Sequence, residues 1–564
     1  MASLPGFRVV IFSSIDPAAI ARLAERIQKE VPEARVCGIL YEEWTPKPLS
    51  RRALSFLKNL RDPAFIRYAA ARVIRGLSRP TARFGHLLLR LAHAHQGRSN
   101  ALHRSGVEAL TEFCRRNDCS IHLTRDIHAP ESLAFVRGLG PDLGIVYGTR
   151  ILKADLFTIP RQGSINIHKR KLPDYRGGGP IGLWELLEGA PDIGVTVHRV
   201  QSKVDAGAIL GATTIPIEPF DTLSSLDLKA QVVGGDLLVE TVAGIARGDI
   251  CERPQEGPSR LFRSPAPQTL AAYERQIRRA RPPYQPERGR PAWKLLTKTL
   301  LFGLPAIWRN WSHRRRGGFP VVVLYHHLVS DRPHPMGIPT DLYVRHVRFL
   351  QEHYQIVTLA HACDLLKQGR VKVPTVVLTF DDGYQDNFLT LRAIREETGA
   401  PMMLFVCTEK VTNHEPFEHD TRIGQGGFLA LTWEQIRLLE REGFEIGSHT
   451  RTHFDCGSSD PAVLRNEIVG SQEDLRRYIG RAVESFSFPW GQPANMSAEA
   501  VELARSTFPY VCSAYGGVNL PGQNPSWHIL RCSHPNDLWE LELVLQSLLE
   551  FTPARAGPAA IPRG

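Results

Sequence analysis

The chain of 564 residues lacks the cysteine pattern of a disulfide-stabilised protein. Its nine cysteines are scattered, their number is odd, and none forms a Cys-x-x-Cys pair. This distribution argues against a disulfide framework and favours a reducing compartment. The first residues, MASLPGFRVVIFSS, also lack the basic segment and long apolar run of a secretory signal. We therefore expect a cytoplasmic protein.

The chain has the composition of an ordinary globular protein, with 43% hydrophobic and 23% charged residues. Its length exceeds that of a single hydrophobic core and suggests roughly two to four domains. The net charge of +11 is concentrated in two segments. Residues 45–105 hold 13 lysines and arginines against one acidic residue, and residues 260–317 hold 14 against two. Such segments usually meet a lipid surface, a phosphate-bearing substrate or a nucleic acid.

Both basic segments contain helical patterns with two open interpretations. In 45–105, apolar residues recur every fourth position from Phe65 to Leu77 with arginines between them, which predicts an amphipathic helical insertion. In the Pro/Arg-rich linker predicted at 256–317, the stretch 292–311 interleaves three tryptophans with lysine and arginine, and Pro305 should kink it. The helix within 45–105 either presents a solvated face or contacts a membrane or a phosphate. The stretch 292–311 either packs on a domain surface or lies at a membrane interface, which would place the protein peripherally on the inner face of the membrane.

Short apolar runs predict two α/β domains on either side of that linker. The first domain, 1–255, has expected strands at 8–13, 34–40, 143–147 and 164–168, with a helix at 17–29. This alternation is typical of a doubly wound, Rossmann-like sheet. A second domain, 318–550, begins with expected strands at 321–325 and 375–380 and continues as repeated strand–helix units, which favours a barrel-like fold. Residues 551–564 form a tail.

One group of polar residues lies at expected strand ends of the first domain. Asn166 and His168 alternate on one face of a strand, and Asp205 follows a later strand in the segment Val-Asp-Ala-Gly. The carboxyl end of a parallel strand is where such folds bind ligands. An amide N–H and an imidazolium can stabilise an oxyanion, and a carboxylate can orient the histidine or accept a proton. The set therefore suits acyl transfer to an amine.

These residues resemble the folate-dependent formyltransferases, in which an Asn-x-His pair precedes a loop like Leu172–Gly177 and a catalytic Asp like Asp205. The resemblance covers roughly residues 6–250 and implies 10-formyltetrahydrofolate as the donor. It also implies that the backbone around Arg150, Ile151 and Leu152 binds the pterin ring. The basic insertion departs from small family members. The chain also shows no barrel-like tRNA-binding extension after this domain, which favours a nucleotide- or lipid-linked amino sugar over a nucleic acid as partner.

A second group lies in the later domain. Asp381 and Asp382 follow an apolar strand, and His449 and His453 stand four residues apart, a spacing that predicts one side of a helical turn. One carboxylate and two imidazoles form a common hydrolytic metal set, and the other carboxylate can accept a proton from water. Zinc suits these ligands, although other divalent ions also use them.

This pattern resembles the polysaccharide deacetylases, the NodB homology family, whose fold is a deformed (β/α) barrel. The resemblance covers about residues 318–545 and implies that Asp381 is the general base and that Asp382, His449 and His453 hold the metal. Residues 486–491 resemble the family's third motif. Many members carry an arginine at the position of Ser487, which Arg531 would replace here. His534 is the candidate general acid.

Together the two groups predict an enzyme that formylates an amino sugar and removes an N-acyl group, acetyl or formyl, from a sugar in cell-surface glycan or glycolipid synthesis. Two alternatives remain open. The transferase could act on another amine such as aminoacyl-tRNA, or the chain could be a binding protein with degenerate sites. The sequence leaves the oligomeric state unknown.

Overall fold

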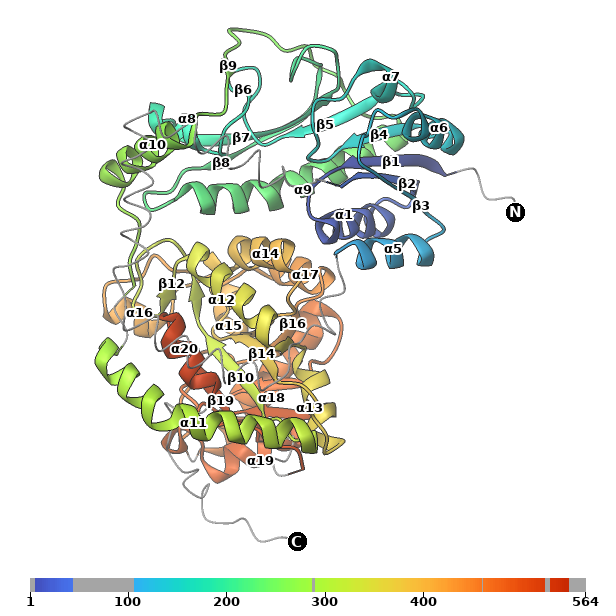
Figure 1. Ribbon diagram of the computed structural model, residues 1–564. Coiled ribbons are helices and arrows are strands. Elements are labelled where there is room, and N and C mark those ends of the chain that lie inside the picture. The colour runs from blue at the N-terminus through green and yellow to red at the C-terminus, as the bar shows by residue number, and fades with distance from the viewer. Residues whose placement is uncertain (1–5, 44–105, 287–289, 459, 523–527, 547–564) are drawn as a thin grey trace. The chain divides into compact units, whose positions relative to one another are not determined.

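The computed structural model describes residues 6–43, 106–286, 290–458, 460–522 and 528–546 (Figure 1). The predicted basic insertion and the C-terminal tail lie outside these residues. The described residues divide into two compact units, one ending at Pro283 and the other beginning at Tyr284. Among them, no helix has the length and apolar character needed to cross a bilayer.

The first unit is built on a seven-stranded sheet with the order β3-β2-β1-β4-β5-β7-β8 (Figure 1). The strands are β1 Phe7–Ser13, β2 Ala34–Glu42, β3 Ser120–Thr124, β4 Leu143–Val146, β5 Ser164–His168, β7 Asp192–Arg199 and β8 Ile209–Pro216. The pairs from β3 to β5 are parallel, whereas β7 runs antiparallel to both β5 and β8. The sheet thus has a doubly wound half and an antiparallel edge, and β5 lies where the two meet.

Helices cover both faces of this sheet, which explains why β1 is apolar at consecutive positions. Val9 and Ile11 pack with one core, formed with α1, α5 and α9, and Val10 and Phe12 pack with another, formed with α6 and α7. A strand buried on both faces cannot alternate polar and apolar residues. The helices of this unit are α1 Pro17–Glu30, α5 Gly106–Arg116, α6 Pro130–Leu139, α7 Ala154–Phe157, α8 Leu183–Glu188, α9 Leu223–Arg247 and α10 Pro267–Ala280. Two short strands, β6 Arg176–Gly177 and β9 Leu261–Phe262, pair separately.

The second unit is an all-parallel sheet with the order β18-β17-β16-β15-β14-β10-β19, and β13 pairs with β14. Its strands are β10 Val321–His326, β13 Gln355–Ile356, β14 Thr375–Phe380, β15 Met403–Val406, β16 Glu445–Ser448, β17 Ser485–Ser487, β18 Tyr510–Cys512 and β19 Arg531–Ser533. The segment leading into β19 bonds back to β18, because Ile529 N–H donates to the Val511 carbonyl at 2.7 Å. The sheet is therefore a nearly closed barrel, as the sequence predicts.

Helices surround this barrel. They are α11 Ala292–Arg316, α12 Thr340–His353, α13 Leu359–Lys367, α14 Asp386–Thr398, α15 Thr408–Asn413, α16 Glu418–Arg422, α17 Trp433–Arg441, α18 Pro461–Ile479, α19 Ala498–Thr507 and α20 Leu538–Leu545. The segment predicted as a linker contributes α10 to the first unit and α11 to the second. Pro305, which we expected to kink this segment, lies inside α11, and the helix continues on both sides of it.

Candidate active sites

The first candidate site forms where β5 meets β7. The antiparallel register places Asn166 opposite His198, and the Asn166 amide nitrogen lies 3.1 Å from His198 Nε2. His198 Nδ1 lies 2.9 Å from the Arg199 carbonyl and so holds the ring proton, which leaves Nε2 to accept from the amide. Because an amide nitrogen carries two hydrogens, Asn166 keeps a second N–H for a ligand. The sequence motif did not identify His198, although its position in a strand opposite Asn166 could have.

Asp205 reaches the same place from the loop after β7. Its Oδ2 accepts a hydrogen bond from Gly177 N–H at 3.0 Å and lies 3.7 Å from His168 Nδ1, while its Oδ1 lies 3.6 Å from His198 Nε2. The loop is tight, since Asp205 has φ +48° and a Cβ on Gly207 would lie 1.9 Å from the Arg199 carbonyl oxygen. The Val-Asp-x-Gly segment thus holds Asp205 in place and requires glycine at 207.

The surroundings of Asp205 keep its carboxyl group ionised. Burial alone would raise the pKa of Asp205, but the contact with His198, the charge of His168 and the Gly177 N–H hold it below its ordinary value. Burial lowers the pKa of His168, against the opposing effect of Asp205. His168 Nε2 donates to the Tyr175 carbonyl at 2.8 Å, so its Nδ1 faces Asp205. Asp205 is therefore a proton acceptor, and His168 acts on it electrostatically.

A pocket of about 200 Å³ joins these groups to the loop after β4. Asn166, His198 and Asp205 line it together with all three predicted pterin-binding residues, Arg150, Ile151 and Leu152. His168 is not among the lining residues and contacts the pocket through Asp205. The Arg150 guanidinium is bound by Glu42, with Nε 2.9 Å from Oε2, which leaves any pterin contact to the backbone and apolar side chains of this loop.

The pocket fits a folate-type donor by the chemistry of its walls. One wall is a strand-end loop with apolar side chains, and the other presents the Asn166 amide and the Asp205 carboxylate. A flat heterocycle needs an apolar slot with backbone polar groups, and its formyl group needs a hydrogen-bond donor. The apolar residues of the lining are Val146, Ile151, Leu152, Ile167, Val200 and Val204.

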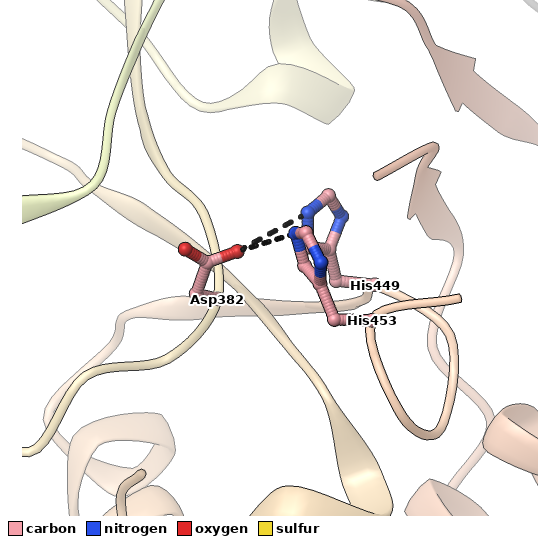
Figure 2. A group of neighbouring side chains, drawn as sticks. All are labelled: Asp382, His449 and His453. Carbon is pink, nitrogen blue, oxygen red and sulfur yellow. Dashed lines mark ion pairs between the residues drawn. The ribbon is translucent and has the colours of Figure 1, made fainter. Parts of the chain in front are cut away.

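The second candidate site lies in the barrel unit, where Asp382 and the two predicted histidine ligands converge (Figure 2). Asp382 Oδ1 lies 3.4 Å from His449 Nε2 and 3.2 Å from His453 Nε2. The three ligand atoms lie within 4.8 Å of one another. Asp382 is the second residue after β14 and adopts a positive φ of +71°. The structure thus brings together the predicted metal set.

A divalent cation fits this set because Asp382 is otherwise an unsatisfied buried charge. Asp382 is fully buried, and neither of its carboxylate oxygens has a hydrogen-bond partner among the described residues. Such a charge is costly unless it is paired or coordinates a metal. His449 Nδ1 donates to the Ser487 carbonyl at 2.7 Å, which fixes the tautomer and leaves Nε2 for a metal. Asp382, His449 and His453 would therefore hold the ion.

The two histidines do not lie on a helix, contrary to the spacing argument. Residues 449–453 form a loop in which Thr450 and His453 adopt positive φ, 65° and 66°. The buried carboxylate of Glu467 on α18 holds this loop, accepting bonds from the N–H groups of Arg451 and Thr452, both at 3.0 Å. Glu467 lies outside the sequence motifs, so only the fold shows that it positions the metal ligands.

Asp381 is paired with Arg531, the residue expected to replace the missing arginine. The Arg531 guanidinium donates to both Asp381 oxygens at 2.7 Å and to Ser487 Oγ at 2.6 Å. Burial would raise the pKa of Asp381, but the Arg531 charge and hydrogen bonds hold it below its ordinary value. The arginine comes from β19 rather than β17, and the small Ser487 leaves room for it. Asp381 is therefore an ionised, fixed carboxylate, as a general base requires.

His534 is placed away from this set, which argues against its predicted role as the general acid. It is buried, its Nε2 lies 3.0 Å from His346 Nδ1, and its ring stacks on His346 and lies 4.9 Å from Tyr343, both on α12. Burial holds its pKa well below the ordinary value. Strand alternation explains the placement, because Arg531 points into the barrel and His534, three residues on, points to the opposite face.

Two other histidines lie beside the metal set. The charge of His327, at the end of β10, contributes to lowering the pKa of Asp381 and of Asp382. His419 on α16 lies 3.9 Å from Asp382 Oδ2, and Tyr384 holds it through a contact of 2.9 Å between its hydroxyl and His419 Nε2. The Tyr384 hydroxyl in turn donates to buried Asp420 at 2.7 Å. Sequence reasoning missed both histidines, although His327 follows the expected opening strand.

Comparison with known proteins finds a family match for each of two segments of the chain. Residues 94–242 match the formyl transferase family and residues 368–508 match the polysaccharide deacetylase family. The methionyl-tRNA formyltransferase of Roseiflexus sp. (strain RS-1) is 38% identical over 135 residues, which cover 24% of this chain and 41% of the relative. That of Thermodesulfovibrio yellowstonii is 33% identical over 164 residues, 29% of this chain and 52% of the relative. The chain thus spans about half the length of these curated relatives.

Solved structures of both kinds are also similar to the chain. IcaB from Ammonifex degensii aligns over 40% of this chain and 97% of its own, with 23% identity and a TM-score of 0.35. A sugar N-formyltransferase from a Shewanella species aligns over 46% of this chain and 76% of its own, with 15% identity and a TM-score of 0.29. On the two family matches, this chain joins a formyl transferase family domain to a polysaccharide deacetylase family domain.

Proposed function

We propose that the chain transfers a formyl group from 10-formyltetrahydrofolate to the amine of an amino sugar, and that its second site hydrolyses an N-acyl group, acetyl or formyl, from a sugar. The observation that supports this most directly is the pairing of two intact sites for acyl–nitrogen chemistry in one chain. A binding protein with degenerate sites would have no need of a buried, unsatisfied Asp382 beside two histidines.

In the transferase site, each residue has one task. The donor supplies an activated formyl group when bound. The free N–H of Asn166 stabilises the negative charge that develops on the formyl oxygen as the substrate amine attacks. Asp205, held ionised by its surroundings, accepts the proton that the amine loses. His168 and the Gly177 N–H keep Asp205 in position. As the formyl group passes to the sugar nitrogen, the carbon–nitrogen bond to the donor would break, and Asp205 would return the proton it accepted to the departing donor nitrogen.

In the hydrolase site, a divalent cation on Asp382, His449 and His453 supplies the Lewis acidity that polarises the acyl group and lowers the pKa of water. Asp381 takes the proton from the attacking water, and Arg531 fixes both of its oxygens. The departing sugar nitrogen needs a proton. We assign this proton to His327, which directly follows β10 and contributes to lowering the pKa of both aspartates.

Aminoacyl-tRNA is a second candidate acceptor for the formyl group, and one observation favours it. The curated relatives named above are methionyl-tRNA formyltransferases, and the first basic segment could meet RNA. The amino-sugar acceptor is preferred because the deacetylase family domain acts on carbohydrate in the same chain, so one class of substrate serves both sites.

The chemistry of the two reactions allows two orders, of which we favour deacetylation before formylation. Removal of an acetyl group exposes an amine, which formyl transfer can then modify, so one chain would exchange acetyl for formyl. The alternative is that formyl is added first and removed later. We place the exchange in the cytoplasm, in the synthesis of a cell-surface glycan or glycolipid, on a nucleotide- or lipid-linked sugar.

The test is to incubate the purified chain with nucleotide-linked amino sugars, their N-acetyl forms, formyl donor and zinc, and to follow substrate mass. We expect a gain of formyl that Asn166→Ala abolishes and a loss of acyl that Asp382→Ala abolishes. Parallel reactions contain methionyl-tRNA as the acceptor. If only the tRNA is formylated, the sugar proposal is wrong. If neither variant changes either activity, the site assignments are wrong.

A further inference from the structure

Helix α11 carries an apolar surface that the described residues of its unit leave exposed. Five large apolar residues along it have side chains between 41% and 68% exposed, namely Trp293, Leu300, Leu301, Trp308 and Trp311. Isolated exposed apolar residues are ordinary, but a row of them with three tryptophans on one helix is not. We refer to these five residues as the outer face.

The opposite side of α11 is firmly packed, so the exposure of the outer face is not a sign of a loosely held helix. Leu295, Thr299, Ala306 and Asn310 are buried. The Trp539 indole N–H of α20 donates to Thr299 Oγ1 at 3.1 Å, and the Asn310 amide donates to Gln546 Oε1 at 2.9 Å. These polar contacts in a buried interface fix the rotation of α11 about its axis.

The outer face forms one continuous stripe. At 100° per residue, Trp293 and Trp311 point in the same direction, and the other three residues fall within roughly 100° of arc around them. The stripe extends along most of α11. The helix thus has two apolar sides, one that docks onto its own unit and one that faces outward. The two sequence interpretations, surface packing and a membrane interface, are therefore not exclusive.

The charge around the outer face has one sign. Residues 292–316 contain six lysines and arginines and no acidic residue. Arg309 is turned inward and donates to the Gln546 carbonyl at 2.7 Å. Lys294 and the run Arg314–Arg316 are exposed, and the Arg315 guanidinium stacks over the Trp311 ring at 4.1 Å. The surface therefore combines exposed tryptophan and leucine with cations at both ends.

We propose that α11 docks the protein on a membrane surface that contains anionic phospholipid, with the outer face in the headgroup region. Tryptophan prefers that region because its ring is amphipathic, and leucine reaches the acyl boundary. The flanking cations meet the lipid phosphates. A protein partner would suit the apolar stripe equally, but the all-cationic border complements an anionic plane. This inference does not depend on the proposed activities, because docking is measured without substrate.

The experiment is vesicle flotation of the full chain at moderate salt, with neutral phosphatidylcholine vesicles and with vesicles that also contain phosphatidylglycerol. We expect strong binding only to the anionic vesicles. The variant Leu301→Gln/Trp308→Gln should weaken binding at least about tenfold, because it removes apolar area from the stripe. The variant Arg314→Gln/Arg315→Gln/Arg316→Gln should weaken binding by a similar factor and reduce its salt dependence.

Matched controls exist on the same chain. Arg476→Gln/Arg477→Gln removes exposed arginines from the last turn of α18, and Leu123→Gln removes an exposed apolar side chain from β3. Neither should change binding. Quenching of tryptophan fluorescence by brominated acyl chains should occur in the wild type and decrease in Trp308→Gln. Circular dichroism checks that each variant is folded.

The proposal is wrong if the wild type floats with neither kind of vesicle, or if the outer-face variant binds as tightly as the wild type. It is also wrong if the outer face joins two copies, so that the wild type sediments as a dimer and Leu301→Gln/Trp308→Gln as a monomer without any vesicle dependence.

Discussion

The two candidate sites differ in how far their polar groups are satisfied before any ligand arrives. In the transferase site, Asp205 already accepts from Gly177 N–H, and Asn166 already bonds to His198. In the hydrolase site, both oxygens of the buried Asp382 lack a hydrogen-bond partner among the described residues. The first site is thus shaped by its own hydrogen bonds, whereas the second is completed only by a cation. Ligand removal should therefore affect the two units differently.

The largest expected effect comes from removing the unsatisfied carboxylate. Asp382→Asn should reduce deacylation by about a thousandfold or more, since loss of metal activation is worth several kcal/mol, and should leave formyl transfer unchanged. The measurement is kcat/KM for both reactions. Asp341→Asn, the same substitution at an exposed carboxylate of the same unit, is the control. Equal losses in both reactions would show that the sites are not independent.

In the transferase site, whose polar groups already bond to one another, Asn166→Ala should reduce formyl transfer by about 10²- to 10³-fold. This is the usual cost of losing one donor to a developing oxyanion. Deacylation should not change. Asn117→Ala, which removes an amide bonded to the Phe113 carbonyl in the same unit, should leave both reactions intact. A transferase that retains full kcat without the Asn166 amide would contradict the proposed role.

Two histidines of the barrel unit are expected to differ in role: His327 donates a proton in the reaction, whereas His534 only packs in the interior. His327→Asn should lower the kcat of deacylation by about a hundredfold, as expected for loss of a proton donor. His534→Asn should leave kcat intact and lower the melting temperature, because it breaks a buried bond to His346 worth about 1–3 kcal/mol. The opposite result, with His534 decisive for kcat, would restore the role predicted from sequence.

The smallest effect concerns stability. At a hundredfold excess over Kd, a bound cation stabilises its unit by about 2.7 kcal/mol, so chelation should lower the melting temperature of the barrel unit by roughly 5–11 °C. Zinc should restore it. The melting transition of the transferase unit should not move, and Asp382→Asn should abolish the response. If the melting transitions of both units respond to chelator, the two sites do not differ in their dependence on a cation.

Much of this organisation could be predicted from sequence because its signals are local. The strand at 375–380 was predicted with the bounds of β14, since a fully buried parallel strand is a continuous apolar run. The polar residues at the ends of such strands were predicted as site residues for the same reason. Glu467, His198 and His419 were missed because they reach the sites from elements that carry no motif.

The two errors concern orientation. Four-residue spacing predicted a helical turn for His449 and His453, but two left-handed residues place them in a loop. His534 was predicted as the general acid because it is the candidate histidine near the C-terminus, but in the fold it is buried and bonds to His346.

By itself, the sequence determined that the chain has two α/β domains, that each carries one set of reactive side chains, and that a basic, tryptophan-containing stretch follows the first. Only the tertiary structure decided which side chains meet: that Glu467 holds the loop of the two metal-site histidines, that His198 orients Asn166, and that α11 keeps one apolar side outward. The physical reason is that composition and spacing act along the chain, whereas hydrogen bonds and burial depend on which segments the fold brings side by side.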